Sequence, residues 1–268
     1  MPAASAISYS FSELGPAQLT GASPLADECA LAIGYNGLNQ AVMMVSPSDL
    51  EDFVLGFSLS NGLIDNPAEL YDIRLSGAGE ARRVEVEIAS RAFWALKQQR
   101  RQLAGNSGCG LCGVEALEQA LPELAALPST PLPPPEHLDE LRARVAAAQL
   151  QAQASGAMHA ALFVDDRGEI RLCREDIGRH NALDKLIGAL ARQRLQARTG
   201  FVVLTSRCSL ELLHKAVRVG IPTLVSLSAP TALTVDWARR HRLNLIHLPH
   251  SSAPRVYSPA PTSEEVPI

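Results

Sequence analysis

The chain carries two cysteines three residues apart, Cys109 and Cys112, inside a glycine-rich stretch that runs from Asn106 to Gly113. Glycines flank and separate the thiols, so no bulky neighbour shields either sulfur. Apolar residues then recur at helical spacing, which predicts a loop leading into a helix N-terminus. The free N–H groups and the dipole of such a helix stabilise a nearby thiolate by about 1 kcal/mol. The spacing therefore favours chemistry at an ionised sulfur.

Four kinds of chemistry use a cysteine pair of this spacing. A structural zinc site needs four ligands, whereas the other cysteines are scattered singly (Cys29, Cys173, Cys208). A deaminase zinc site needs His-x-Glu ahead of Pro-Cys-x-x-Cys; no such motif precedes Cys109, and Gly108 stands where the proline would be. A thioredoxin-like oxidoreductase places its pair after the first strand of its sheet, which is not the position of Cys109 and Cys112 in this chain. The spacing of the two cysteines still allows a disulfide between them. The fourth is sulfur carriage, in which a thiolate accepts a sulfane sulfur as a persulfide and passes it on.

The densest polar segment is Arg174–Asn181, which holds six ionisable or amide side chains between a predicted strand and a predicted helix. A helix N-cap needs only one of them, so we interpret the segment as a polar site. Arg179 and His180 are its candidate partners for a thiolate or a ligand phosphate. His159 lies on an apolar predicted strand, where a structural role and a site role are equally favoured.

Three loops at predicted strand ends form a second set of candidates. They are Thr205–Ser209, which contains Ser206 and Arg207, then Ser228–Thr231, and Leu248–Ala253. In a parallel sheet, ligands bind beyond the carboxyl ends of the strands, where loops meet helix N-termini. Hydroxyl groups, an arginine and free helix N-termini suit an anionic or nucleotide-like ligand.

The hydrophobic pattern predicts an α/β protein with two folded parts. We expect a flexible arm over residues 1–24, a smaller N-terminal α+β domain over 25–105, the cysteine loop with a helix and a proline-rich connector over 106–136, a C-terminal α/β domain over 137–257, and a tail over 258–268. Apolar strands alternate with amphipathic helices in the C-terminal part, which indicates βαβ units and a mainly parallel sheet.

Shorter patterns predict individual elements. Asn36 and Gly37 predict a type I′ turn between two strands. Ser48 and Glu51 predict a capping box that begins a helix. Residues 137–154 are rich in alanine and predict one helix.

Composition excludes several classes of protein. A net charge of -4 provides no basic footprint for nucleic acid. The longest uncharged run, Val219–Val235, contains two prolines and is shorter than a bilayer span, so we expect no membrane helix. The N-terminus lacks the charged region and apolar core of a secretory signal, and the odd number of cysteines favours free thiols. We therefore expect a cytoplasmic protein.

Five ordered segments resemble the signature of the formate dehydrogenase accessory sulfurtransferase family, also called FdhD/NarQ, over residues 27–257. They are Gly108–Gly113, Ser155–Ala161, Glu175–Lys185, Thr205–Lys215 and Gly220–Pro222. The resemblance implies a protein that takes sulfur from a cysteine desulfurase and delivers it to the molybdenum cofactor, bis-molybdopterin guanine dinucleotide (bis-MGD), for apo formate dehydrogenase. It also implies a cytidine-deaminase-like α/β/α C-terminal domain without the deaminase zinc, no tightly held metal of its own, and a homodimer.

The resemblance also assigns roles by position. Cys109 corresponds to the persulfide-forming cysteine and Cys112 to its companion, and these are the predicted catalytic residues. The family's cofactor-binding segment falls on Leu248, Pro249, His250, Ser251, Ser252 and Ala253, and we add Arg179, His180, Ser206 and Arg207 to the predicted cofactor-binding set. The sequence thus predicts a sulfurtransferase. The alternative is a cofactor-binding escort without sulfur transfer, while a nucleotide hydrolase would need a metal-ligand set that we do not find.

Overall fold

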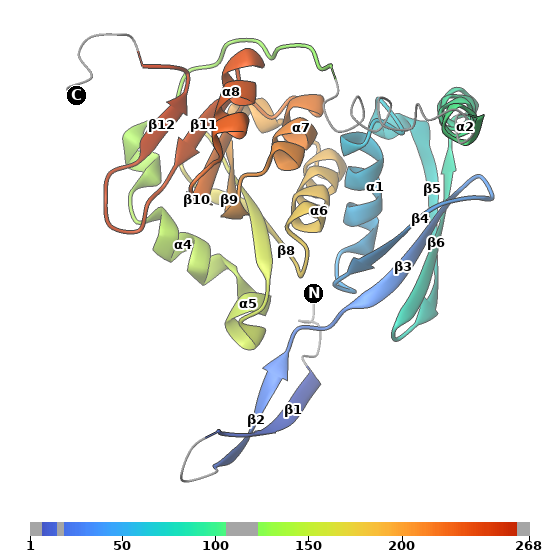
Figure 1. Ribbon diagram of the computed structural model, residues 1–268, viewed down its shortest axis with the longest axis horizontal. Coiled ribbons are helices and arrows are strands. Elements are labelled where there is room, and N and C mark those ends of the chain that lie inside the picture. Colours follow the sequence, from blue (N-terminus) through green and yellow to red (C-terminus); the bar gives the residue numbers. More distant parts are fainter. Residues whose placement is uncertain (1–6, 15–18, 106–122, 262–268) are drawn as a thin grey trace.

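The computed structural model describes residues 7–14, 19–105 and 123–261 of the 268-residue chain. These residues form a four-stranded sheet, a six-stranded sheet and a two-stranded hairpin, with helices packed between the two larger sheets (Figure 1). Within the described ranges, no helix is both long and apolar enough to cross a membrane. The sheets and the helices between them make a mixed α/β fold.

The four-stranded sheet has the strand order β4-β3-β6-β5. Its strands are β3 (Cys29–Tyr35), β4 (Leu38–Val45), β5 (Leu70–Ala78) and β6 (Ala81–Ile88). Strands β3 and β6 are parallel, and the other neighbours are antiparallel. Asn36 and Gly37 join β3 to β4 with φ angles of 47° and 80°, the left-handed conformations that a type I′ turn requires. The predicted turn is confirmed.

The helices of this first part are α1 (Leu50–Ser60), the 3-10 turn η1 (Pro67–Glu69) and α2 (Ser90–Gly105). The predicted capping box at the start of α1 is wrong. Asp49 occupies the N-cap position in the left-handed conformation, with φ 51°, and makes no side-chain cap. The Ser48 hydroxyl instead lies 3.5 Å from the amide oxygen of Gln151, in the second part of the chain.

The six-stranded sheet has the strand order β12-β11-β10-β9-β7-β8. Its strands are β7 (His159–Val164), β8 (Ile170–Asp176), β9 (Phe201–Arg207), β10 (Thr223–Ser228), β11 (Asn244–His247) and β12 (Arg255–Ser258). Strands β9, β10 and β11 are parallel, but β7 is antiparallel to both of its neighbours and β12 is antiparallel to β11. The sheet is therefore mixed rather than mainly parallel, because a hairpin and a returning strand complete it.

The helices of the second part are α4 (Leu141–Ala148), α5 (Leu150–Ser155), α6 (Arg179–Arg192), α7 (Leu210–Arg218) and α8 (Ala232–Arg240), with 3-10 turns η2 (Pro135–Leu138) and η3 (Ala197–Thr199). The single helix predicted over 137–154 is wrong, because it is divided into η2, α4 and α5. Glu140 interrupts it in the left-handed conformation. The Glu175 carboxylate of β8 then accepts the N–H groups of Gln151 and Ala152 at 2.9 and 2.8 Å, which caps the new start of α5.

The described part of residues 1–24 differs from the flexible arm that the sequence predicts. Strands β1 (Ile7–Ser12) and β2 (Thr20–Leu25) pair as an antiparallel hairpin, which projects away from the two sheets (Figure 1). The mixture of serine, alanine and proline hides this pairing from a periodicity argument, because neither strand buries a continuous apolar face.

Helices α1 and α6 connect the two sheets by crossing at one glycine in each helix. A Cβ atom on Gly56 would overlap the backbone carbonyl of Asp184, and one on Gly188 would overlap that of Asp52. The absence of both side chains therefore permits close backbone contact. Buried apolar residues from both sheets form one hydrophobic cluster around this crossing. The crossing fixes how the first sheet lies relative to the second.

Two histidines flank the indole of Trp237 in the core between α7 and α8. Their ring centroids lie 4.6 Å (His214) and 4.7 Å (His241) from that of the indole. Burial is the main cause that lowers the pKa of His214, to about 4, and the charges of His241 and Arg218 act in the same direction. The folded chain therefore favours a neutral His214, whereas an unfolded histidine takes up a proton near pH 6.5.

We expect the free energy of unfolding to decrease as the pH falls from 6.5 towards 4, because the unfolded state then binds a proton that folded His214 rejects. One such group contributes at most about 1.4 kcal/mol per pH unit. Urea unfolding at a series of pH values should show a shallower slope for His214→Phe than for the wild type. The exposed His250 provides the control, since His250→Gln should keep the wild-type slope. Equal slopes for wild type and His214→Phe would contradict the prediction.

Candidate functional site

The carboxyl ends of β8, β9, β10 and β11 meet at one edge of the six-stranded sheet, which we call the carboxyl edge. Strand β8 runs in the same direction as β9 because both are antiparallel to β7. His159 begins β7 at this edge, opposite Asp176 of β8. The carboxyl edge therefore brings together three predicted segments from distant parts of the sequence: Arg179 with His180, Ser206 with Arg207, and Leu248–Ala253.

Arg179 is the first residue of α6 and is half-buried. Its Nε atom is buried and has no hydrogen-bond partner among the described residues. Burial lowers the pKa of His159, and the nearby Arg179 guanidinium lowers it further. A buried guanidinium N–H without a partner in this part of the chain is suited to an anionic oxygen, such as one of a phosphate.

His180 lies beside Arg179 and faces α7. Its Nε2 atom is 2.7 Å from the Glu211 carboxylate. Burial is the main cause that lowers the pKa of His180, and Glu211 partly opposes it. The imidazole is therefore predominantly neutral at pH 7, when it can donate or accept a hydrogen bond without adding charge. Glu211 belongs to the Thr205–Lys215 segment of the family signature, but no sequence pattern indicated that its side chain would contact His180.

Ser206 and Arg207 end β9 and differ in exposure. Ser206 is buried, and its hydroxyl donates to the Arg207 carbonyl at 3.1 Å. The Ser226 hydroxyl of β10 contacts the Ser206 carbonyl at 3.1 Å and the Ser228 carbonyl at 2.7 Å. Ser206 therefore shapes the strand end, whereas the exposed Arg207 side chain has no ion pair within the described ranges and is free to meet a ligand.

The Leu248–Ala253 loop begins at a buried residue and then becomes exposed. Arg142 of α4 fixes its start, since the guanidinium donates to the carbonyl oxygens of Pro249 at 3.2 Å, Leu227 at 2.6 Å and Leu248 at 2.5 Å. The fork of one arginine therefore joins the ends of β10 and β11. Sequence reasoning missed Arg142, which lies in an alanine-rich segment with no motif of its own.

We expect Arg142→Ala to loosen this loop while leaving the fold intact, because three carbonyl oxygens lose their donor. Hydrogen–deuterium exchange should become faster at the amides of residues 248–253, by about tenfold or more. Arg144 on the same helix is the matched control. It donates to the carbonyls of His137 and Gly168, so Arg144→Ala should leave exchange at 248–253 unchanged. Wild-type exchange in the Arg142→Ala loop would contradict this role.

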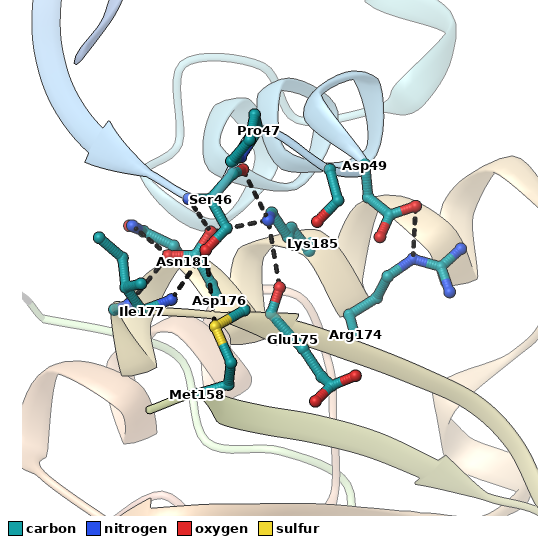
Figure 2. Close-up of polar contacts among 12 residues, drawn as sticks. Ser46, Pro47, Asp49, Met158, Arg174, Glu175, Asp176, Ile177, Asn181 and Lys185 are labelled. Atoms are coloured by element: carbon teal, nitrogen blue, oxygen red, sulfur yellow. Dashed lines mark hydrogen bonds and ion pairs between the residues drawn. The ribbon is translucent and has the colours of Figure 1, made fainter. Parts of the chain in front are cut away.

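Most of the dense polar segment serves the interior rather than a ligand. The Lys185 ammonium and the Asp176 carboxylate are 2.7 Å apart, and both side chains are fully buried (Figure 2). Lys185 also donates to the carbonyls of Ser46 and Glu175, each at 3.1 Å. Asp176 accepts the Ser46 N–H at 2.9 Å and the Asn181 amide at 2.9 Å. We call Ser46, Asp176, Asn181 and Lys185 the buried polar network; it joins the end of β4 to β8 and α6.

A second buried ion pair reinforces the same interface. The Lys215 ammonium of α7 contacts both carboxylate oxygens of Asp184 at 2.9 Å. The Ser60 hydroxyl at the end of α1 donates to the same carboxylate at 2.6 Å. Elsewhere in the segment, Arg174 pairs with Asp52 at 2.8 Å and Glu175 caps α5. Arg179 and His180 therefore remain as the candidates for a ligand at the carboxyl edge.

Comparison with known proteins identifies the family to which the chain belongs. The family model for the FdhD/NarQ family matches residues 26–263. The chain belongs to the FdhD/NarQ family. Proteins named sulfur carrier protein FdhD are 41% identical over 240 residues in Bordetella petrii (89% of this chain, 86% of the relative), and 46% identical over 238 residues in Xanthomonas euvesicatoria (87% and 83%). The expected family is therefore confirmed.

A solved structure shows the same fold. The crystal structure of a formate dehydrogenase accessory protein from Desulfotalea psychrophila matches with a TM-score of 0.72 at 23% identity. The match covers 94% of this chain and 96% of that one. Almost the whole mixed α/β architecture, with both sheets, is therefore shared with that protein.

The predicted catalytic residues of this FdhD/NarQ family member, Cys109 and Cys112, lie outside the described residues. Burial raises the pKa of Cys173 and Cys208 to about 12 and raises that of Cys29. These three thiols are therefore neutral at pH 7 and poor nucleophiles. Among the described residues, no group of three or more potential ligands could hold a metal ion.

The connector that follows the cysteine segment crosses the amino ends of the strands. The Leu127 N–H donates to the His241 carbonyl at 2.9 Å, just before β11. The Asn244 amide at the start of β11 donates to the carbonyls of Thr130 and Pro131, each at 3.2 Å. The described connector therefore lies at the opposite edge of the sheet from Arg179 and the 248–253 loop.

Proposed function

We propose that this chain is a sulfur carrier that serves formate dehydrogenase through a persulfide on Cys109. The observation that carries the proposal is membership of the FdhD/NarQ family together with the retained Cys109 and Cys112 pair. The names of the relatives support it, since they are called sulfur carrier proteins. The neutral state of the other three thiols also supports it, because it leaves the pair as the remaining candidates for a thiolate.

In the proposed reaction, a cysteine desulfurase presents a persulfide on its own cysteine. The Cys109 thiolate attacks the terminal sulfur, an S–S bond forms at Cys109, and the S–S bond of the desulfurase breaks to release its thiolate. No external oxidant is required, because the sulfane sulfur only changes its carrier. In the second transfer, the S–S bond of the Cys109 persulfide breaks and Cys109 leaves as the thiolate, while the outer sulfur passes to the substrate bis-MGD. The two electrons that take this sulfur to the sulfide level would come from the reduced metal centre of the substrate or from a cellular thiol reductant.

The carboxyl edge is the surface that we propose for bis-MGD. The buried Nε of Arg179 lacks a partner among the described residues, and the exposed Arg207 lies on the same edge. Both can bind phosphate oxygens of a guanine dinucleotide. The hydroxyl and peptide groups of Leu248–Ala253, which Arg142 holds in place, offer further donors and acceptors.

The position of the connector is compatible with such a transfer. Strand β10 has six residues, so the two edges of the sheet are about 20 Å apart. Ten residues lie between Cys112 and Glu123, where the described connector begins, and the eleven Cα–Cα steps from one to the other span at most about 40 Å. Cysteines on this segment therefore have the reach for either edge. By family resemblance, we also propose a cytidine-deaminase-like second part, a homodimer and a cytoplasmic location.

The proposal is tested by incubating the purified chain with a cysteine desulfurase and cysteine and then measuring its intact mass. A carrier gains the mass of one sulfur atom, which a reductant removes. The alternative, an escort that only binds the cofactor, activates formate dehydrogenase with no gain in mass. Activation without sulfur loading would therefore replace the carrier proposal with the escort.

Binding of GDP tests the carboxyl edge separately, because GDP contains the guanine, ribose and phosphate groups of the cofactor. We expect Arg179→Gln to weaken GDP binding about tenfold or more, since hydrogen bonds to charged groups contribute roughly 1.5–3 kcal/mol. Titration calorimetry measures the change. Arg167 is exposed in the β7–β8 turn, away from the carboxyl edge, so Arg167→Gln is the control. Equal affinities for the two variants would exclude Arg179 from the nucleotide site.

A further inference from the structure

A hollow of about 380 Å³ lies at the amino edge of the six-stranded sheet, opposite the carboxyl edge. It is bounded by the end of α1, the end of α6 and the segments that precede β9 and β10. Its described walls are largely apolar, and they include Leu59, Ile64, Ile187, Leu190, Leu195 and Ile221. The volume is within the range of sites for small molecules, which are about 300–1,000 Å³.

The charged residues of this hollow are unbalanced. Arg198 and Arg218 line it, and neither has an ion pair or a hydrogen bond within the described ranges. The one acidic lining residue, Asp65, contacts Arg91 at 3.1 Å. Arg91 is shared with Glu69 at 2.6 Å, so Asp65 keeps part of its negative charge. The described lining therefore presents two exposed arginines without ion-pair partners beside an apolar wall, and its net charge is positive.

Packing holds one of these charges in place. Gly62, which follows α1 with φ +68°, has no side chain where the Arg218 guanidinium lies, and a Cβ there would overlap the guanidinium. Arg218 therefore lies against the backbone of the first part of the chain while it extends from α7 of the second part. A solvated arginine at a helix C-terminus would explain Arg218 alone. Arg198 is also exposed, and it brings a second guanidinium to the same hollow from the 3-10 turn η3.

We propose that this hollow binds a small organic anion that has an apolar body and a single carboxylate or sulfonate group. The apolar body would contact the aliphatic walls and remove them from water, while the acidic group would meet Arg198 and Arg218. The site is distinct from the carboxyl edge and does not depend on the sulfur-carrier proposal. Because its walls come from α1, α6 and α7, an occupant would contact both parts of the chain and stabilise their packing.

Two fluorescent probes that differ in charge test the proposal. The anionic probe is 8-anilino-1-naphthalenesulfonate, and the neutral one is N-phenyl-1-naphthylamine, which lacks the sulfonate. We expect the wild-type chain to bind one anionic probe at least tenfold more tightly than the neutral probe. The double variant Arg198→Gln/Arg218→Gln should bind both probes with similar affinity. Arg167→Gln, which also removes one exposed charge, should bind like the wild type.

A second variant separates this hollow from other apolar surfaces. Ala191 lines the hollow, so Ala191→Phe should fill it and weaken both probes at least tenfold. Circular dichroism and thermal unfolding check that each variant is folded. The proposal is overturned if the double arginine variant keeps the wild-type preference for the anionic probe, or if a folded Ala191→Phe protein binds both probes as the wild type does.

Discussion

Cys109→Ala is expected to abolish sulfur loading from a cysteine desulfurase, so that the intact mass of the chain stays unchanged after incubation. The reason is that burial keeps the three described thiols neutral, with the pKa of Cys173 and Cys208 raised to about 12. At an unperturbed pKa of about 8.5, a thiol is a few per cent ionised at pH 7, whereas at 12 the fraction is smaller by roughly three orders of magnitude. No described cysteine can therefore replace Cys109 at a comparable rate.

Two single-cysteine variants control this experiment. Cys173→Ala removes a half-buried thiol that is not part of the pair, and it should gain one sulfur as the wild type does. Cys112→Ala should also gain one sulfur, because the proposed acceptor remains. Peptide mapping of the loaded protein should place the extra sulfur on residue 109. Loading of Cys109→Ala together with failure of Cys112→Ala would reverse the assignment within the pair. Loading of both variants would show that Cys109 is not the sole acceptor, because either Cys112 or another thiol then accepts sulfur.

Lys185→Met is expected to cause the largest loss of stability of any single change considered, about 3–5 kcal/mol in the free energy of unfolding. The methionine keeps most of the side-chain volume but leaves the fully buried Asp176 without its ion-pair partner. The carbonyls of Ser46 and Glu175 also lose a donor. Since a typical domain is stable by about 5–15 kcal/mol, such a loss is a large share of the total.

Chemical denaturation of three variants measures this contribution. Arg74→Met breaks an exposed pair with Asp72, 3.4 Å apart, and should cost at most about 1 kcal/mol. The double variant Lys185→Met/Asp176→Asn should recover part of the loss, because the uncompensated buried carboxylate is gone while the asparagine oxygen still accepts from one of its two donors, Ser46 or Asn181. If Lys185→Met were no less stable than Arg74→Met, the buried polar network would not hold the two parts together as we infer.

Local patterns predicted those features that depend on neighbouring residues. The turn at Asn36 and Gly37 follows from their tolerance of positive φ, which is a property of the residues themselves. The alternation of strands and helices after residue 159 predicted that several loops would share one edge, because parallel strands place their carboxyl ends together. In this way the sequence grouped the loops Thr205–Ser209, Ser228–Thr231 and Leu248–Ala253, whereas the position of Arg179 at the same edge came only from the structure.

Contacts between residues far apart in the sequence determine the features that local patterns did not predict. The charges of Arg174–Asn181 indicated a polar site, but Asp176 and Asn181 are partners of Ser46 and Met44, 130 and 137 residues away. Arg142 holds carbonyls 85–107 residues away. The helix predicted over 137–154 is divided where Glu175 caps α5. A sequence shows which groups are polar, but burial decides whether a polar group must find a protein partner, and only the tertiary structure sets that burial.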